Sequence, residues 1–289
     1  LLHREPSPQA HAQSDIDVAK LRQLSLPPAA GQLAPFKEAA TTAVVGINGA
    51  GKTTLLRRLS DESHAVMLTQ KPALPPHSTV AEAITMVTHD KAATAELIAA
   101  AGLSEIAEIK ARDLSGGQAA QAGLVRALAA RPSILLLDEP LAAVDAAAAA
   151  QWRKLLAAAS HDRTTVMVTH NVLDLLSLAD EVAVVERGKI LLHAPTNEIV
   201  ENPPNHFVAR LLGRVVIQGR LEQGAVIPDT TGPTRFVLSP EEITLTESGR
   251  WQAKIKDIRA HSLDRVIAAL DLSGQHVEAA IGIDQAKTL

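Results

Sequence analysis

The fold of this chain is decided by the stretch Gly46-Ile47-Asn48-Gly49-Ala50-Gly51-Lys52-Thr53, which follows the apolar run Thr42-Ala43-Val44-Val45. The stretch fits the pattern G-x-x-x-x-G-K-[ST], in which glycines allow backbone N–H groups to surround phosphate oxygens. The pattern requires a strand before it and a helix after it, and the sequence predicts both, with the helix running from Lys52 to about Leu59. A chance glycine-rich turn is the competing interpretation. We expect nucleotide phosphates to contact the residues of this loop and the residue after it: Gly46, Asn48, Gly49, Ala50, Gly51, Lys52, Thr53 and Thr54.

A second chemical element is the apolar run from Ser133 to Leu137, which leads into Asp138 and Glu139. Because the run lacks polar alternation, it predicts a buried strand of a parallel sheet that is covered on both faces. Ligands bind at the carboxyl ends of strands in such sheets, so we expect Asp138 to contact Mg²⁺ together with the Thr53 hydroxyl. Glu139 is the candidate general base that orients or deprotonates an attacking water. The alternative is that both carboxylates only favour a helix N-terminus.

Composition limits the class of protein. The chain has 289 residues, 46% of them hydrophobic, which is enough for one sizeable core and a smaller domain. It has no cysteine, which excludes disulfides and a thiol nucleophile and suits a reducing cytosol. A formal net charge of −4 argues against a nucleic-acid binder that works by bulk electrostatics. No apolar run approaches the ~18 residues that span a bilayer. Leu1 in place of Met leaves open whether the natural start is included.

The alternation of predicted strands and helices indicates an α/β fold with a mostly parallel sheet. We expect a disordered tail over residues 1–15, early strands within 16–45 and a helical subdomain over about 72–117. An alanine-rich helix over about 146–159 and a second buried strand from Thr165 to Val168 follow the paired carboxylates. The first domain is expected to span residues 16–212.

The pattern changes near Pro203-Pro204, and residues 213–289 form the second predicted domain. This region contains short runs in which apolar and polar residues alternate, for example around Trp251, Ala253 and Ile255. Ser273-Gly274 lies between two such runs and is typical of a hairpin turn. The pattern therefore predicts a small antiparallel β domain.

The segment Leu114-Ser115-Gly116-Gly117-Gln118 lies between the glycine-rich loop and the paired carboxylates. Ser115 is a good N-cap, and the amides after it can bind an anion. The segment resembles the signature of ATP-binding cassette (ABC) ATPases, and the resemblance covers residues 41 to about 195. It implies a P-loop NTPase cassette that binds ATP and Mg²⁺ and forms a head-to-tail dimer. In that dimer, the nucleotide of one copy would contact the signature of the other through Ser115, Gly116, Gly117 and Gln118.

Three further positions are similar to functional residues of the family. Gln70 resembles the glutamine that contacts Mg²⁺ or the attacking water and couples to the membrane partner. Asp145 resembles the aspartate that crosses the dimer interface, and His170 resembles the switch histidine that contacts the γ-phosphate. The resemblance thus implies catalytic roles for Glu139, His170 and Gln70. Alone, a histidine after a strand is more often a structural or surface group.

The chain also departs from the family pattern. The interval from Gly51 to Gln70 is short, which implies a reduced antiparallel subdomain. There is no tyrosine, and Phe36 lies too close to Gly46 to replace the aromatic residue that stacks on adenine in the family. After the signature, alanines stand where the family often has polar or basic residues, which implies weaker hydrolysis than is typical.

The C-terminal half resembles importer ATPases that carry a regulatory β domain. Residues 205–213 are similar to the linker of these proteins, and residues 239–245 to the strand that opens their β domain. The remainder resembles a small barrel of the oligonucleotide-binding (OB), TOBE or Mop type. Residues 41–46 and 277–281 look most like molybdate importers. The resemblance implies an ATP-hydrolysing importer subunit for molybdate or a related oxyanion, with iron, sulfate, polyamine or sugar as the alternative solute.

Several partners are implied by this resemblance. They are a pair of membrane permease subunits and, indirectly, a solute-binding protein, and they do not include nucleic acid. The chain itself is expected to lie peripherally at the cytoplasmic face of the membrane. Residues 79–112 and the loop after Gln70 are expected to form the groove for a permease helix. A soluble ABC protein of ribosomes or DNA is the first rival, but such chains usually carry two cassettes or a long coiled coil before the signature. An exporter is the second, and the β domain argues against it. The β domain either binds an oxyanion or only mediates subunit contacts.

Overall fold

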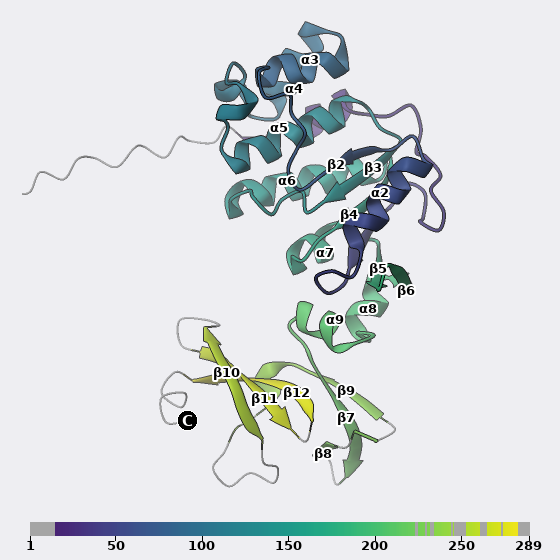
Figure 1. Cartoon of the computed structure of the whole chain (residues 1–289), viewed down its shortest axis with the longest axis vertical. Coiled ribbons are helices and arrows are strands. Elements are labelled where there is room, and N and C mark those ends of the chain that lie inside the picture. Colours follow the sequence, from purple (N-terminus) through teal and green to yellow (C-terminus); the bar gives the residue numbers. More distant parts are fainter. Residues whose placement is uncertain are drawn as a thin grey trace, which may run out of the picture. The chain divides into compact units, whose positions relative to one another are not determined.

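The computed structural model describes residues 15–222, 225–228, 230–231, 234–243, 245, 253–260, 265–272 and 274–282. Residues 1–14 of the predicted tail, Trp251, and Ser273 of the predicted turn lie outside these residues. The chain divides into two compact units, Leu1–His193 and Ala194–Leu289, which are described separately (Figure 1). The domain boundary at residues 212 and 213 stays a prediction. Within the described ranges, no helix is long and apolar enough to cross a membrane.

The first unit contains a six-stranded sheet in the order β2-β3-β4-β1-β5-β6. The pairs β2–β3, β3–β4, β4–β1 and β1–β5 are all parallel, so the predicted mostly parallel sheet is confirmed. The two-residue turn Arg187-Gly188 joins β5 to β6, and both of its residues have a positive φ, as tight hairpin turns require. The strands are β1 (Thr41–Val45), β2 (Val66–Leu68), β3 (Ile134–Asp138), β4 (Thr164–Val168), β5 (Glu181–Glu186) and β6 (Lys189–Pro195).

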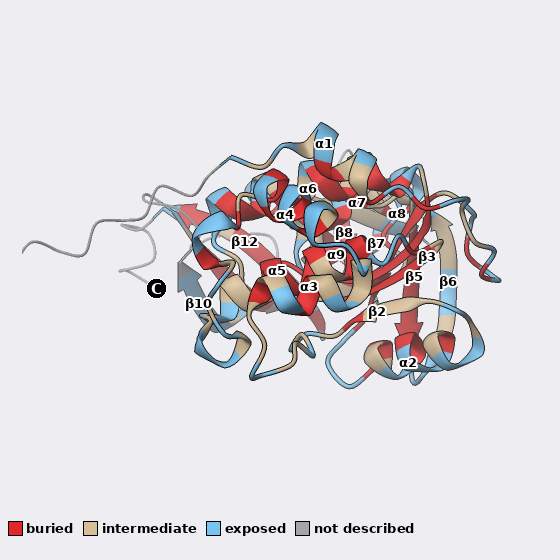
Figure 2. Ribbon diagram, turned by 90° about the horizontal axis from the view of Figure 1, so that it is seen from above, coloured by how far each residue is buried: buried red, intermediate tan, exposed pale blue. Residues whose placement is uncertain are grey.

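The interior strand β3, next to the edge strand β2, is buried on both faces (Figure 2). Alternate residues of a strand point to opposite faces, so its leucines contribute to two cores. Leu136 packs in one core with α2 (Lys52–Glu62), whereas Leu135 and Leu137 pack in the other with α5 (Gly116–Ala129) and α6 (Ala146–Ser160). Burial on both sides explains the unbroken apolar run, and it fixes Asp138 at the end of a rigid strand.

A helical segment separates β2 from α5. Its main elements are α3 (Val80–Thr88) and α4 (Lys91–Ala100), followed by two short 3-10 helices, Ser104–Ile106 and Ala111–Asp113. α3 begins with a capping box between Thr79 and Glu82, which satisfies the first amides of the helix. α3 and α4 pack against each other and against α5, which places the helical segment next to the signature helix.

The second unit contains two three-stranded antiparallel sheets, in the orders β8-β7-β9 and β10-β11-β12. Residues of both sheets share one apolar core, including Val215 and Ile217 of β7 and Val277 and Ala279 of β12. The side-chain amide of Gln275 joins the sheets, because it accepts from Gln218 N at 2.7 Å and donates to Gln218 O at 2.8 Å. The elements are α8 (Thr196–Glu201), α9 (His206–Leu211), β7 (Val215–Glu222), β8 (Ala225–Pro228), β9 (Thr234–Leu238), the 3-10 helix Pro240–Glu242, β10 (Lys254–Ala260), β11 (Arg265–Leu272) and β12 (Gln275–Gly282).

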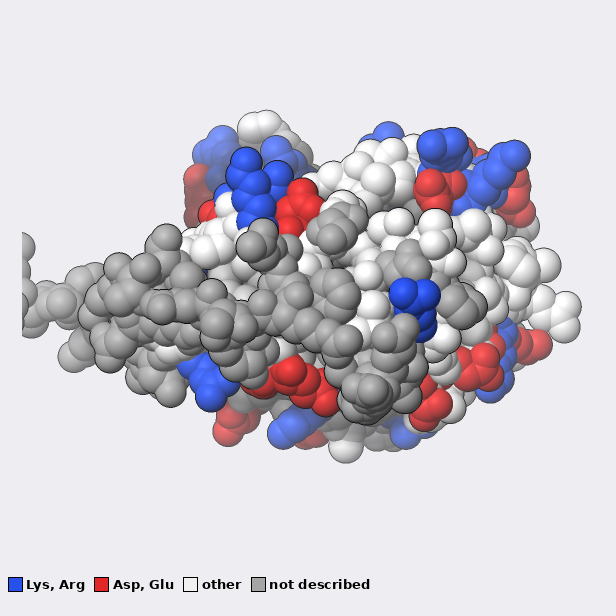
Figure 3. All heavy atoms as spheres, turned by 90° about the horizontal axis from the view of Figure 1, so that it is seen from below, with Lys and Arg blue, Asp and Glu red and all other residues white. Residues whose placement is uncertain are grey.

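Among the described residues on the face shown in Figure 3, charged side chains of both signs lie close to one another. This mixture agrees with the small formal net charge of −4. A face of mixed charge exerts little net long-range force on a charged partner.

The start of the first unit differs from the prediction of early strands within residues 16–45. Apart from β1, this region forms the helix α1 (Val18–Leu24) and an extended segment with one isolated bridge between Leu33 and Phe36. Val18, Leu21 and Leu24 recur at helical spacing and pack against the core of α5 and α6, which explains why a helix forms there. The prediction of strands was therefore wrong for residues 16–40.

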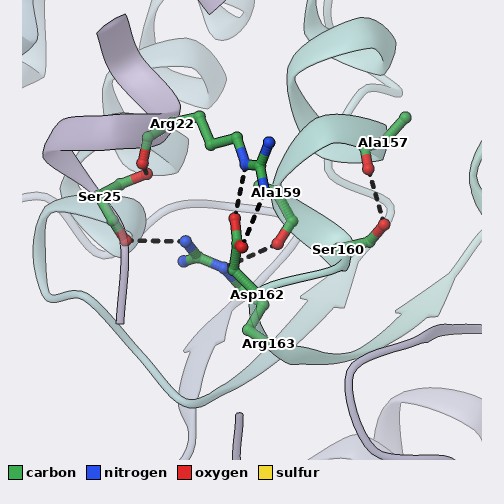
Figure 4. A network of polar contacts seen from close by, with 7 residues as sticks. All are labelled: Arg22, Ser25, Ala157, Ala159, Ser160, Asp162 and Arg163. Carbon is green, nitrogen blue, oxygen red and sulfur yellow. Dashed lines mark hydrogen bonds and ion pairs between the residues drawn. The ribbon is translucent and has the colours of Figure 1, made fainter. Parts of the chain in front are cut away.

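Polar contacts anchor α1 to the segment after α6 (Figure 4). Arg22 donates two hydrogen bonds to the carboxylate of Asp162, at 2.7 and 2.9 Å. Arg163, which is fully buried, donates to Ser25 O at 2.8 Å. Burial lowers the pKa of Arg163 to about 10, so the guanidinium remains charged at neutral pH. Both arginines tie the end of α1 to the rest of the first unit.

Candidate functional site

The glycine-rich loop lies against the turn between β5 and β6. A Cβ on Gly46 would lie 2.3 Å from Val185 O, and a Cβ on Gly51 would lie 2.9 Å from Gly188 Cα. The Gly188 N–H donates to Ala50 O at 2.7 Å, which fixes the two segments together. Gly51 also has a φ of 94°, in the region that favours glycine. Because the backbone of the β5–β6 region lies so close, glycine is required at both ends of the loop.

Lys52 begins α2 and turns back into this loop. Its Nζ donates to Gly46 O at 2.8 Å and to Ile47 O at 3.0 Å, and the residue is only 7% exposed. Burial lowers the pKa of the Lys52 ammonium, and the nearby carboxylates of Glu139 and Asp138 act in the opposite direction. A buried cation inside a loop of glycine amides, at the start of a helix, is suited to bind phosphate.

Two of the three predicted Mg²⁺ ligands lie together. Thr53 Oγ1 donates to Asp138 Oδ2 at 2.9 Å, and Asp138 is 6% exposed at the end of β3. A hydroxyl and a carboxylate are oxygen ligands of the kind that Mg²⁺ prefers, so this pair fits the ion. The third predicted ligand, Gln70, instead donates from its Nε2 to Glu139 Oε2 at 3.1 Å.

Glu139 is held between two of the predicted catalytic residues. Gln70 contacts one carboxylate oxygen, and His170 Nε2 lies 3.2 Å from the other, Oε1. Glu139 has a φ of 51°, and its N–H donates to Val168 O at 3.0 Å. A non-glycine residue in this backbone region costs on the order of 1–3 kcal/mol and is often found at active sites. The structure therefore brings Glu139, Gln70 and His170 into one cluster.

The loop that carries His170 has polar support that the sequence pattern did not reveal. Thr169, directly before it, donates from Oγ1 to Asp174 Oδ2 at 3.1 Å, and Arg153 Nε donates to Asp174 Oδ1 at 2.6 Å. The signal in the sequence was weak, since it consisted of one acidic residue in the first turn of the helix α7 (Val172–Leu178). The arginine comes from α6, and its proximity depends on tertiary packing.

The signature forms the N-terminus of α5. Ser115 Oγ accepts from Gln118 N at 3.2 Å, and Gln118 Oε1 accepts from Ser115 N at 2.9 Å, which makes a capping box. A Cβ on Gly117 would lie 2.9 Å from Ala143 O, so this helix end packs closely on the loop before α6. Asp145 ends that loop and caps α6 by accepting from the amides of Ala147 and Ala148.

Phe36 is part of the core. It is 6% exposed, packs in the cluster around α2 and places its ring 5.7 Å from the ring of His193. A ring in this position has no free face on which an adenine could stack.

Comparisons with known proteins identify the family. A family model described as "ABC transporter" matches residues 60–142. The Fe(3+) ions import ATP-binding protein FbpC of Pseudomonas fluorescens is 32% identical, over 84% of this chain and 79% of that protein. This chain belongs to the ATP-binding proteins of ABC importers. It is therefore an ATPase coupled to transport, and it binds ATP through the cassette of the first unit.

Other relatives of this importer protein carry different solute names. The molybdenum import ATP-binding protein ModC of Mycobacterium tuberculosis is 33% identical, over 62% of this chain and 60% of the relative. The putative 2-aminoethylphosphonate import ATP-binding protein PhnT of Salmonella typhimurium is 32% identical, over 63% and 58%. Membership among import proteins favours uptake over both rivals, the exporter and the ribosome- or DNA-associated protein.

A solved structure shares the fold. It is the dimeric ATP-binding cassette in a post-hydrolysis state with ADP and Pi, which superposes with a TM-score of 0.51 at 21% identity. The alignment covers 56% of this chain and 87% of the solved chain. The predicted ABC cassette fold is confirmed.

Proposed function

We propose that two copies of this chain bind two ATP–Mg²⁺ between them and hydrolyse ATP in a composite site. The observation that carries the proposal is the placement of Glu139 between Gln70 and His170. One half of the site is the glycine-rich loop with Lys52, and the other is the signature at the N-terminus of a partner's α5. The Ser115 cap leaves the first amides of α5 oriented along the helix axis, where they suit an anion.

Each residue of the site is assigned a role from its contacts together with the resemblance to the family. Lys52 and the loop amides would bind the β- and γ-phosphates. Thr53 and Asp138 would hold Mg²⁺, which neutralises developing charge when it is bound. Glu139 would accept a proton from the attacking water or orient it, and His170 and Gln70 would hold the Glu139 carboxylate in position. Asp145 would contact the partner copy across the dimer interface. Because Asp145 caps α6, it fixes the end of the loop that precedes this helix.

The permease is proposed to dock on the helical segment. A pocket of this segment is lined by residues of α3, α4 and residues 104–108, and it includes Met86, which is 50% exposed. Methionine adapts to irregular apolar partners, so it suits a surface that receives a helix. Such docking would place the chain peripherally at the cytoplasmic face of the membrane, with a solute-binding protein acting through the permease.

For the solute, an oxyanion such as molybdate is the substrate class that we favour. Relatives named for molybdenum and for 2-aminoethylphosphonate import support an oxyanion, although a relative named for iron is equally similar. Isothermal titration of the full chain with molybdate, tungstate and sulfate tests whether the second unit senses this solute. Heat with molybdate and tungstate is expected. No heat with any of the three would leave solute selection to the permease and contradict a regulatory oxyanion site.

The composite site is tested with Glu139→Gln. This change keeps the hydrogen-bonding shape of the side chain but removes the general base, so ATP should persist between two bound copies. Size-exclusion chromatography with light scattering should show a dimer for the variant with ATP and Mg²⁺, and a monomer without nucleotide. Lys154→Met, at an exposed position of α6, is the matched control and should behave as wild type. A variant that remains monomeric with ATP would refute the composite site.

A further inference from the structure

We propose that Asp174, held by Arg153, is a positioning residue that acts through Thr169 to direct His170 toward Glu139. This inference rests on the proposed role of His170 in hydrolysis. It adds three residues to the site, to none of which the sequence pattern assigned a role.

The anchor of the arrangement is a buried ion pair. Asp174 is 4% exposed, and its Oδ1 accepts from Arg153 Nε at 2.6 Å. The side chain of Arg153 is 14% exposed, so both partners are largely removed from water. A charge-assisted hydrogen bond of this length between buried groups holds both side chains in one geometry. The Asp174 carboxylate is therefore a fixed point between α6 and α7.

Thr169 connects this fixed point to the loop. Its hydroxyl donates to the second carboxylate oxygen, Asp174 Oδ2, at 3.1 Å and accepts from the Asn171 backbone N–H at 3.0 Å. The residues immediately before and after His170 are thereby tied to the same hydroxyl. Asn171 is fixed further because its Oδ1 accepts from Leu173 N at 2.8 Å and caps α7.

The side chain of His170 projects from the loop that these hydrogen bonds fix. Thr169 is 2% exposed, whereas the side chain of His170 is 35% exposed and reaches Glu139 at 3.2 Å. A short loop whose flanking residues are both hydrogen-bonded leaves few orientations for the residue between them. The imidazole is thus directed at the carboxylate before nucleotide arrives, and preorganisation of this kind raises the rate of a chemical step without requiring tighter ground-state binding.

Thr169 is the best position for a test, because its hydroxyl can be removed without removing a charge. Thr169→Val keeps the shape and deletes the hydroxyl, and Thr169→Ser keeps the hydroxyl. We expect Thr169→Val to lower kcat about tenfold, with an unchanged Kd for ATP, and Thr169→Ser to stay within about twofold of wild type. Equal loss in both variants, or a Kd that weakens in parallel with kcat, would show a merely structural role.

A double-mutant cycle separates action through His170 from an independent effect. Single-turnover rates are measured for His170→Ala, Thr169→Val and the double variant. If Thr169 acts through His170, the second change adds nothing in the His170→Ala background. Additive losses would overturn the positioning role but leave the proposed function intact. A His170→Ala variant as fast as wild type would instead refute the proposed role of His170 itself.

Two further variants distinguish a loss of positioning from a general loss of folding stability. Asp174→Asn preserves the side-chain shape and should reproduce the kinetic effect of Thr169→Val if it folds. Asp162→Asn removes another ion pair, with Arg22, which lies in the anchor of α1 and is more exposed than the Arg153–Asp174 pair. It should lower the melting temperature while kcat stays unchanged. Loss of kcat in Asp162→Asn equal to that in Asp174→Asn would mean that general destabilisation, and not positioning, explains the result.

Discussion

Gly117 faces the backbone of Ala143 so closely that a Cβ on Gly117 would lie 2.9 Å from the Ala143 carbonyl oxygen. This contact joins the signature at the start of α5 to the loop that ends in Asp145. Both elements are proposed to meet a partner copy, and the contact couples their positions within one chain. Glycine is therefore needed in the signature for packing as well as for exposing its amides.

The first prediction compares the two signature glycines. Alanine favours a helix over glycine by about 1 kcal/mol, and a Cβ on Gly116 would meet only Ala143 Cβ, at the ordinary distance of 3.9 Å. Gly116→Ala should therefore leave the melting temperature of the nucleotide-free protein unchanged or raise it. Gly117→Ala should lower it, because backbone must move to relieve the contact. Equal melting temperatures would indicate that the loop before α6 shifts freely.

The second prediction concerns Lys52, whose Nζ already lies among the carbonyl oxygens of the loop. Hydrogen bonds to charged groups contribute about 1.5–3 kcal/mol. Lys52→Met keeps the aliphatic stem but removes the charge, so ATP should bind about 10- to 100-fold more weakly. Titration with a fluorescent ATP analogue measures this Kd, with Lys154→Met as the exposed control. Unchanged affinity would place the phosphates elsewhere.

Elements with strong local signals were predictable from the sequence. β3 has no polar alternation because both of its faces are covered, and α5 begins at a capping box that the sequence spells out with Ser115 and Gln118. The glycine-rich loop was recognisable because close backbone approach at Gly46 and Gly51 permits no other residue. In each of these cases, local chemistry and the fold agree.

Other features depend on contacts between distant parts of the chain. The seven-residue helix α1 is too short for the helical spacing of its apolar residues to be decisive, and its burial depends on α6 and on Asp162, which is 140 residues from Arg22. The Arg153–Asp174 pair likewise requires that α6 and α7 pack together. The sequence could indicate His170 but not what holds it.

A third prediction concerns the second unit. Gln275 is 7% exposed, and its amide makes both an accepting and a donating bond to the backbone of Gln218. Gln275→Ala removes both of these partly buried hydrogen bonds and should cost about 1–3 kcal/mol. Gln275→Glu can still accept but cannot donate, so it should not restore stability. Hydrogen exchange of β7 and β12 measures the effect, with the exposed Lys254→Ala as control. If the amides of Gln275→Ala are as well protected from hydrogen exchange as those of wild type, the shared core alone holds the sheets together.

The last prediction is a dependence of stability on pH. The hydrogen bonds from Arg22 hold the pKa of Asp162 below its usual value, and burial acts in the opposite direction. Because the folded-state pKa is lowered, the carboxylate stabilises the fold at pH values above its unfolded pKa of about 4, and this contribution is lost as pH falls through the lower folded pKa. Asp162→Asn should therefore have a lower urea midpoint than wild type at about pH 6, and the gap should narrow at about pH 3. Asp61→Asn, at an exposed position of α2, should show no such convergence. A gap that is constant with pH would show that the ionised carboxylate is not what anchors α1.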